Sequence, residues 1–279
     1  MTRSIILFIS ISVSLHAQED LLGLIDDNPK TIPVMATFKA TRIVNAQSIE
    51  MPKPRILEFV ILHRFGSIAN GAYDLFGMDE AVIRFDLEYG FSDRLSIGIG
   101  RSSLNKTYDI FSKLKIVDQR TGHRSFPISL VLFTKMEIET IMKDMDMQDR
   151  YTYDVQFLLA KKLNRSLSLQ LMPTFIHRNL VETHNDHHDL ISLGIGGRIK
   201  MTRRTSINFD TFFPIGKRGE TYKQGWGIGY DIETGGHVFQ LMVTNARGSF
   251  ESEYIENASG AFEDLNLYLG FNISRAFYL

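Results

Sequence analysis

From residue 54 onward, polar and apolar side chains alternate along the chain with a period of two. In residues 80–89, the even positions are mostly charged and the odd positions are all apolar. Because successive side chains of a β-strand point to opposite faces, this pattern predicts a strand with one charged and one apolar face. A helix would spread both kinds of side chain around its circumference. The alternation therefore restricts the chain to folds built from strands.

The alternation recurs in twelve segments, most of them close to the roughly 9–11 residues that a tilted membrane strand needs. The predicted strands span residues 54–65, 80–91, 94–102, 106–118, 126–139, 150–162, 166–178, 189–201, 204–213, 224–233, 236–246 and 265–278. Beyond the N-terminus, no apolar run reaches the roughly 20 residues of a transmembrane helix. A membrane location would therefore require a closed barrel, which pairs every backbone group.

The predicted connections alternate between short and long. Tight turns are centred on residues 92–93, 164–165, 202–203 and 235–236, and the turn at 120–125 is slightly longer. The longer connections are 66–79, 140–149, 179–188, 214–223 and 247–264, and only 103–105 breaks the rule. Short turns on one side, long loops on the other and an even strand number are typical of bacterial outer-membrane barrels.

We therefore predict an all-β fold, a closed antiparallel transmembrane β-barrel of about 12 strands with short periplasmic turns and longer extracellular loops. A soluble β-sandwich and a lipocalin-like barrel also alternate. Neither explains the unequal connections, the charges on nearly every polar face, or the aromatic side chains near the ends of the apolar faces, which fit interfacial girdles. The predicted location is the outer membrane of a Gram-negative bacterium.

The N-terminus predicts export from the cytoplasm. Residues 1–17 resemble a signal peptide, with Arg3 before an apolar stretch and the small Ala17 before a polar sequence. A transmembrane anchor is the alternative, but the apolar run is short for one. Residues 18–53 form an irregular N-terminal segment that we expect at the periplasmic mouth or inside the lumen, and residues 54–279 form the barrel.

The composition excludes several classes of protein. The 279 residues contain no cysteine, so disulfides, cysteine-ligated zinc, iron–sulfur clusters and a lipoprotein anchor are absent. A net charge of −1 argues against a nucleic-acid-binding protein, which would carry a basic surplus. We predict no cofactor.

If the apolar faces meet lipid, the charged faces line the lumen. Candidates for lumen-lining residues are Glu58, Arg64, Arg84, Asp86, Glu88, Lys113, Lys135, Asp154, Arg178, Arg198, Asp210 and Asp231. Basic and acidic residues are nearly equal in number on these faces. This balance favours either a weakly selective aqueous channel or salt bridges that close the lumen. The same faces carry rows of glycines, which permit a bend or the close approach of another segment. These rows are Gly98 and Gly100; Gly194 and Gly196; and Gly225, Gly227 and Gly229.

Histidines offer weak candidates for other chemistry. His184, His187 and His188 could ligate a metal ion, but they lie in a predicted surface loop without regular spacing, so we predict no metal site. A barrel hydrolase would need serine and histidine on one face. His63 and His177 fall on the apolar face, whereas the neighbouring Ser192 and Ser274 fall on the polar face. We predict that the protein is not an enzyme.

Short motifs along the chain add a family resemblance. They are residues 38–42 (FKATR), 44–48 (VNAQS), 63–66 (HRFG), 71–73 (GAY), 76–77 (FG), 98–103 (GIGRSS), 106–109 (KTYD), 170–175 (QLMPTF), 177–180 (HRNL), 194–198 (GIGGR), 231–241 (DIETGGHVFQL) and 270–275 (GFNISR). Together they resemble an outer-membrane β-barrel family of Bacteroidetes-type bacteria that is catalogued as a domain of unknown function. The resemblance spans about residues 36–279 and implies a barrel in the outer membrane, without an assigned substrate or catalytic residue.

Three functions follow as hypotheses. The charged interior favours a pore or binding site for small polar solutes. The alternative is a non-transporting structural or interaction barrel with a closed lumen, and a barrel hydrolase is the third class. The expected partners are outer-membrane lipid and a small polar solute, not nucleic acid; the sequence names no protein partner.

Overall fold

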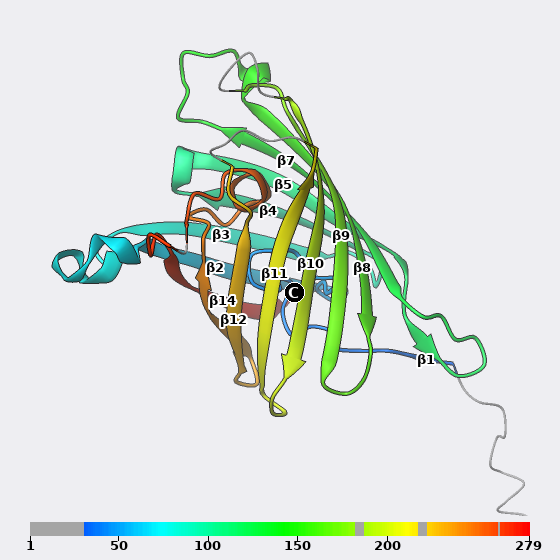
Figure 1. The fold of residues 1–279 in the computed structure, drawn as a ribbon. Coiled ribbons are helices and arrows are strands. Elements are labelled where there is room, and N and C mark those ends of the chain that lie inside the picture. Colours follow the sequence, from blue (N-terminus) through cyan, green and yellow to red (C-terminus); the bar gives the residue numbers. More distant parts are fainter. Residues whose placement is uncertain (1–30, 182–186, 217–221, 262) are drawn as a thin grey trace, which may run out of the picture.

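The computed structural model describes residues 31–181, 187–216, 222–261 and 263–279. Twelve antiparallel strands close into one barrel (Figure 1), in the order β10-β11-β12-β13-β14-β2-β3-β4-β5-β7-β8-β9. These strands are β2 (Ile56–Ser67), β3 (Ala81–Gly90), β4 (Leu95–Ser102), β5 (Thr107–Val117), β7 (Ser129–Glu139), β8 (Tyr151–Lys162), β9 (Leu167–Arg178), β10 (Asp189–Lys200), β11 (Thr205–Ile215), β12 (Trp226–Glu233), β13 (His237–Thr244) and β14 (Tyr268–Tyr278). The predicted fold class is confirmed, and the barrel closes where β14 pairs with β2.

Two strands begin three residues later than predicted, the largest differences at a strand start. The strand predicted from residue 126 begins at Ser129, because Phe126 instead exchanges two backbone hydrogen bonds with Arg120. The strand predicted from residue 265 begins at Tyr268. Apolar side chains alternate before both points, but the backbone pairs elsewhere.

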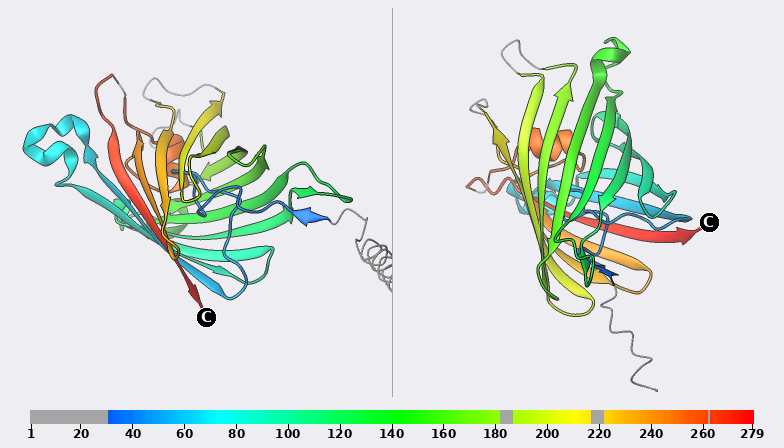
Figure 2. Two further views of the ribbon diagram at one scale, coloured as in Figure 1. Left: turned by 90° about the horizontal axis from the view of Figure 1, so that it is seen from below. Right: turned by 90° about the vertical axis from the view of Figure 1, so that its right-hand side faces the viewer.

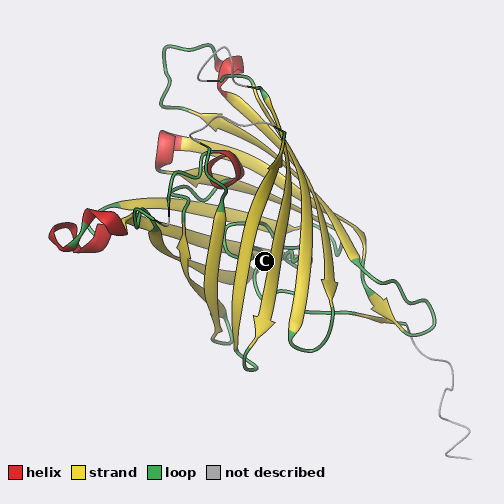
Figure 3. Ribbon diagram, viewed as in Figure 1, coloured by secondary structure: helices red, strands yellow, loops and turns green. Residues whose placement is uncertain are grey.

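Outside the barrel, β1 (Ile32–Pro33) pairs with β6 (Arg120–Thr121) as a small separate sheet. Single helical turns occur in the connections (Figure 3): η1 (Ile68–Asn70), η2 (Ala72–Gly77), η3 (Leu104–Lys106), η4 (Met147–Arg150) and η5 (Ser252–Glu256). Among the described residues, none of the helices could cross a membrane, given their length and hydropathy. The predicted signal peptide, residues 1–17, lies outside the described residues.

The two ends of the barrel differ in the length of most of their connections; the exceptions are residues 118–128, which exceed the predicted turn 120–125, and the short connection 103–106. Connections 91–94, 163–166, 201–204 and 234–236 are short and lie at one end, here called the tight-turn end. The connections after β2, β7, β9, β11 and β13 are longer and lie at the other end, here called the long-loop end. β2 starts and β14 finishes at the tight-turn end, so this end corresponds to the periplasmic side of an outer-membrane barrel.

The two faces of each strand differ in exposure. Apolar side chains on the outer face are solvent-accessible in the isolated chain, including Ile99, Phe157, Leu171 and Ile228. The alternate side chains face the interior and are buried, so buried and exposed residues alternate along each strand as polar and apolar residues do in the sequence. A continuous exposed apolar surface around a barrel is suited to contact with lipid.

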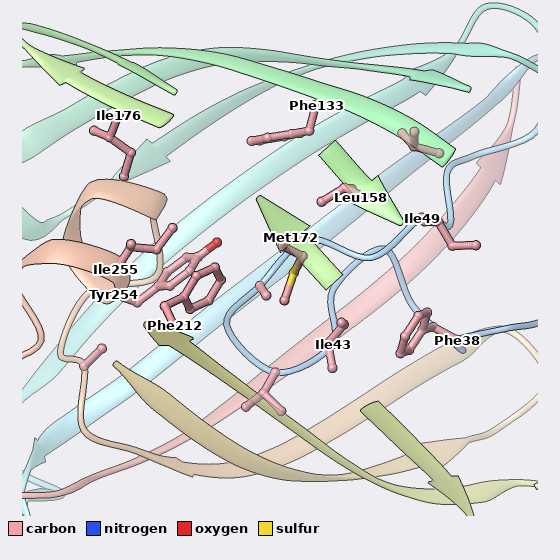
Figure 4. Close-up of a cluster of buried hydrophobic side chains, with 14 of the residues drawn as sticks. Phe38, Ile43, Ile49, Phe133, Leu158, Met172, Ile176, Phe212, Tyr254 and Ile255 are labelled. Carbon is pink, nitrogen blue, oxygen red and sulfur yellow. The ribbon is translucent and has the colours of Figure 1, made fainter. Parts of the chain in front are cut away.

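The interior is more apolar than the charged faces predicted. Inward side chains of β2–β5 include Arg64, Arg84 and Asp109, whereas those of β7–β11 include large apolar groups. Figure 4 shows several of them around one buried cluster: Phe133, Leu158, Met172, Ile176 and Phe212. Large apolar side chains therefore gather on β7–β11, beside the inward charged residues Lys135, Asp154 and Asp210 of the same strands. The same cluster includes Phe38, Ile43, Ile49, Tyr254 and Ile255, which do not belong to the barrel strands.

Candidate functional site

Residues 37–50, here called the inner segment, lie inside the barrel. Figure 2 shows this blue stretch within the ring of strands, and nearly all of its side chains are buried. Two backbone hydrogen bonds fold its centre into a tight hairpin, from Ile43 N–H to the Ala46 carbonyl (2.8 Å) and from Ser48 N–H to the Thr41 carbonyl (2.9 Å). Residues 37–50 thus lie in the lumen, whereas residues 18–30 of the predicted N-terminal segment 18–53 lie outside the described residues.

The tip of the hairpin is held by one carboxylate of the wall. Oδ2 of Asp210, on β11, accepts hydrogen bonds from three consecutive backbone N–H groups, those of Val44 (3.0 Å), Asn45 (2.8 Å) and Ala46 (2.8 Å). Hydrogen bonds to an ionised acceptor are about twice as strong as neutral ones. Asp210 therefore fixes the tip and satisfies donors that would otherwise be buried without partners.

Polar side chains from other strands bind the hairpin from several directions. The acceptors are mostly backbone carbonyls of the inner segment. The wall therefore binds the backbone of this segment rather than its side chains. The contacts are Gln240 to Ile43 O (3.1 Å), Asn272 to Val44 O (3.2 Å), Gln170 to Gln47 O (2.7 Å), Lys113 to Thr41 O (3.1 Å) and Arg64 to Asn45 Oδ1 (3.2 Å). These partners belong to β13, β14, β9, β5 and β2, so the hairpin reaches across the lumen.

Glycines on the wall make room for the hairpin. A Cβ atom at Gly227 would lie 2.7 Å from Asn45 Nδ2 and 2.8 Å from Val44 Cγ1. At Gly196 it would lie 2.6 Å from Ile43 Cδ1. The close approach that the glycine rows predicted is therefore present on β10 and β12, and the approaching segment is the inner segment.

A second segment enters the lumen from the long-loop end. Residues 249–258 of the β13–β14 connection, here called the inner loop, include the π-helical turn η5 and bury Phe250, Glu251, Tyr254 and Ile255. The Ser252 hydroxyl donates to Glu137 Oε2 (2.5 Å), and Lys135 forms an ion pair with Glu251. A Cβ atom at Gly225 would lie 1.8 Å from the Tyr254 carbonyl oxygen, so this glycine admits the loop.

The inner segment and the inner loop meet in a buried network of charges. Arg42 Nη2 lies 3.0 Å from Asp86 Oδ2, and Arg42 Nη1 lies 3.8 Å from Glu251 Oε1. On the wall, Arg84 joins Asp86 (2.6 Å) to Asp109 (2.5 Å). Buried charges are tolerated only when they are paired and hydrogen-bonded, and every member here has an opposite charge beside it.

Electrostatics keep both ends of the Arg42–Glu251 pair ionised. Burial alone would lower the pKa of Arg42, but the carboxylates of Asp86 and Glu251 outweigh it and raise that pKa. Burial alone would raise the pKa of Glu251, but Lys135 and Arg42 hold it well below its usual range. The pair therefore stays charged at physiological pH.

The twelve predicted lumen-lining residues all lie on inward faces, and most contact one of the two segments. Arg64, Lys113 and Asp210 bind the hairpin; Arg84, Asp86 and Lys135 belong to the charge network. Arg178 pairs with Glu256 (2.8 Å), and Arg198 donates to the carbonyls of Ala36 and Thr37. Four others act mainly between wall groups or at the mouth: Glu88 with Ser96, Asp154 with Gln156, Asp231 with Gln240, and Glu58 in the pocket described next.

A pocket of about 360 Å³ opens at the tight-turn end. Its lining includes Lys39 of the inner segment, Glu58 of β2, and Glu233 and His237 beside the β12–β13 turn. Lys39 and Glu233 form an ion pair at this site. The pocket is therefore a vestibule at the tight-turn end, next to the point where the inner segment enters.

Sequence reasoning missed the most connected residues of the site, namely Arg42, Asn45 and Glu251. They lie outside the strands, where alternation does not show whether a side chain points into the lumen. Their partners on the wall were found because each sits at an inward position of a regular strand. The glycine rows were the one signal that another segment would come close.

Among the described residues, the histidines contact neither a cluster of metal-ligating side chains nor a serine hydroxyl. His177 Nδ1 lies 2.7 Å from Asp189 Oδ1, and His188 Nδ1 lies 2.7 Å from the Arg178 carbonyl oxygen. His184 lies outside the described residues, and within the described part no three His, Cys, Asp or Glu residues gather as a metal site. Ser192 is buried on the inner face, and its hydroxyl donates to the Phe213 carbonyl, away from His177.

Comparison with known proteins identifies the family. A model described as "Membrane bound beta barrel domain (DUF5777)" matches residues 38–277. The chain belongs to this family. The match begins inside the inner segment, so the family domain includes the hairpin as well as all twelve strands. As a member of this family, the protein is a membrane-bound β-barrel, and the outer membrane is the location that such a fold supports.

The chain is similar to several solved structures at low sequence identity, and one of them reaches a TM-score of 0.50. A structure titled "NanC porin structure in rhombohedral crystal form" has 7% sequence identity and a TM-score of 0.50, over 80% of this chain and 99% of that chain. The KdgM porin has 8% identity and a TM-score of 0.48, over 80% and 99%. The outer membrane protein Omp33 of Acinetobacter baumannii has 8% identity and a TM-score of 0.45, over 79% and 97%. No curated protein matches the chain.

Proposed function

We propose that this membrane-bound barrel is a gated pore for small polar solutes, and that the inner segment and the inner loop close it at rest. The observation that carries the proposal is the way the hairpin is held. Polar and charged side chains of the wall form hydrogen bonds with its backbone. Asp210 accepts from three N–H groups, and Lys113 donates to the Thr41 carbonyl.

Contacts of this kind are reversible in water. When the hairpin leaves, water can replace its hydrogen bonds to Asp210, Lys113 and Arg64, so the net cost is about 1.5–3 kcal/mol for each bond to a charged group. The groups left behind would line a hydrophilic passage. Since this wall carries both signs of charge, weak selectivity between anions and cations is expected.

A second function is favoured by a different observation. Phe38, Ile43 and Ile49 of the inner segment belong to the same apolar cluster as Phe133 and Met172 of the wall. Burial of such side chains resists the entry of water. These apolar contacts support a permanently closed barrel that serves as a scaffold.

Conductance across a planar bilayer separates the two functions. The wild-type protein should show rare openings, and a variant lacking residues 18–47 should conduct continuously, because the deletion removes the hairpin. Asp210→Ala provides a second variant with every strand intact, and it should open more often than wild type. Heat-dependent migration on a gel checks that each barrel is folded. Folded variants without conductance would exclude the gated pore and support the scaffold.

The proposal contains no catalytic step. A barrel hydrolase remains open to direct test by lipase and protease assays of the purified protein. Any activity that disappeared in His177→Ala would show that the barrel is an enzyme.

A further inference from the structure

The connection between β2 and β3, residues 68–80, carries an exposed apolar surface at the long-loop end. Tyr73 is 96% exposed, Leu75 58%, Phe76 51% and Met78 52%. Figures 1 and 2 show this cyan connection, with η1 and η2, extending sideways from the barrel instead of covering its mouth. We call it the η2 loop. Its apolar side chains are therefore not used to close the lumen.

The backbone of the η2 loop is unusual at two successive bulky residues. Leu75 has φ of 46° and Phe76 has φ of 55°, both in the left-handed region. Residues other than glycine adopt this conformation at an energetic cost, and such strain persists where it serves a purpose. Here the strained turn accompanies apolar side chains that remain largely exposed.

The position of the η2 loop relative to the membrane follows from the length of β2. This strand has 12 residues. At about 3.3 Å per residue and a tilt of about 40°, it rises about 30 Å, which is about the thickness of the hydrocarbon core. The η2 loop therefore begins where the hydrocarbon ends. Below it, the outer faces of β2 and β3 carry Phe65, Ile83 and Phe85, so the apolar surface of the loop continues the lipid-facing surface.

A second connection at the same end also exposes apolar side chains, which alternate with the charged Lys143, Asp144 and Asp146. Between β7 and β8, Ile141 is 54% exposed, Met142 38%, Met145 42% and Met147 59%. β4 and β5 lie between the two connections in the barrel order. Lipid surrounds a barrel and meets both connections, whereas one protein partner would have to reach around the rim.

We propose that the η2 loop lies in the lipid interface of the leaflet at the long-loop end, together with residues 141–147. Tyr73 is a residue type that concentrates at this depth, where its ring contacts acyl chains and its hydroxyl reaches water, and Phe76 adds a second ring beside it. The occupant of this surface is thus phospholipid or glycolipid of that leaflet. This inference goes beyond the proposed pore and holds whether or not the lumen opens.

The chain offers a clean test because it contains one tryptophan, Trp226. In a W226F background, Y73W places a fluorophore on the η2 loop. The folded variant is reconstituted into vesicles that contain brominated phospholipid, which quenches tryptophan in the bilayer, and is titrated separately with acrylamide, which quenches tryptophan in water. F157W on the outer face of β8 serves as the lipid control, and H123W, at an exposed site of the tight-turn end, serves as the water control.

We expect Y73W to be quenched by brominated lipid about as strongly as F157W and to be shielded from acrylamide. M145W should behave in the same way. Quenching of Y73W by acrylamide alone, as for H123W, would place the loop in water and overturn the proposal, leaving the surface available to a protein. A folded M145W tests the same leaflet if Y73W fails to fold, since quenching of that variant by acrylamide alone would also overturn the proposal.

Discussion

The guanidinium of Arg42 lies 3.8 Å from the carboxylate of Glu251, although the two residues enter the lumen from opposite ends of the barrel. The amide of Gln47 also donates to Glu251 Oε1, at 2.9 Å. The buried charge network thus joins the inner segment to the inner loop. Displacement of either segment removes a partner from the other, so the two are expected to move together.

The first prediction concerns the charge of Glu251. Glu251→Gln keeps the shape of the side chain but leaves Arg42 and Lys135 short of a buried partner. Breaking a buried ion pair costs about 3–5 kcal/mol. We expect a marked increase in open probability in planar-bilayer recordings.

Glu80→Gln is the matched control for this change. Glu80 also pairs with an arginine, Arg247, at 3.0 Å, but both side chains are about half exposed. Exposed pairs contribute about 0–1 kcal/mol. Equal effects of the two substitutions would show that the buried network does not hold the barrel closed.

The second prediction concerns the hydrogen bonds that Asp210 accepts from the hairpin tip. Asp210→Asn replaces a charged acceptor with a neutral one and should weaken docking of the inner segment by about 1–3 kcal/mol. The readout is tryptic cleavage after Lys39 or Arg42, identified by mass spectrometry, which should accelerate. Asp154→Asn removes another buried carboxylate, whose amide partner Gln156 lies on its own strand, and should leave the cleavage rate unchanged.

The sequence predicted the wall of this site far better than its contents. Alternation predicts on which side of the sheet each side chain of a strand lies. The inward positions of Arg84, Lys113 and Asp210 could therefore be predicted from the sequence. The strand order follows as well, because short and long connections impose antiparallel neighbours.

The inner segment could not be placed in the same way. Its hairpin is held by hydrogen bonds to backbone atoms, as at Ile43 and Val44, and these leave little pattern in side-chain types. The apolar part of the lumen was also missed, because Phe133, Leu158 and Met172 stand in short apolar runs, where alternation does not show which side chains point inward. Both features depend on contacts between distant parts of the chain.

The third prediction concerns the space that glycine leaves for the hairpin. Gly227→Ala would place a methyl group 2.7 Å from Asn45 Nδ2, so the hairpin tip must shift. Overpacking of this kind typically costs about 1–3 kcal/mol. Hydrogen exchange of residues 41–48 should become faster. Gly236→Ala in the β12–β13 turn meets nothing within 4 Å and should leave the exchange unchanged.

The fourth prediction uses the absence of cysteine in the native chain. A Cβ atom at Gly229 would lie 3.3 Å from Val44 Cγ2, which places V44C and G229C within reach of a disulfide. In a Glu251→Gln background, oxidation of this pair should abolish the additional openings, and reduction should restore them. Current that persists in the oxidised protein would mean that ions pass around the hairpin, and the single variant G229C controls for the added side chain.

The fifth prediction is a pH dependence of the inner loop. Burial raises the pKa of Glu253 from its usual 4.5 to about 7, despite the nearby guanidinium of Arg178, and Glu139 and Glu137 also face it. Between these two pH values the docked loop holds a proton that the released loop gives up. Docking is therefore strongest below about pH 4.5, weakens as the pH rises to about 7, and stays weak above it.

Open probability should accordingly be higher at pH 8 than at pH 5 in the wild-type protein. Glu253→Gln removes the titrating group and keeps the loop in its neutral, docked form, so this variant should open rarely at both pH values. Arg178, Glu139 and Glu137 remain in the variant, which makes it a control for their own titration. A wild-type protein that opens more readily at pH 5 would contradict the assignment of Glu253, because protonation of a buried carboxylate can only favour its buried state.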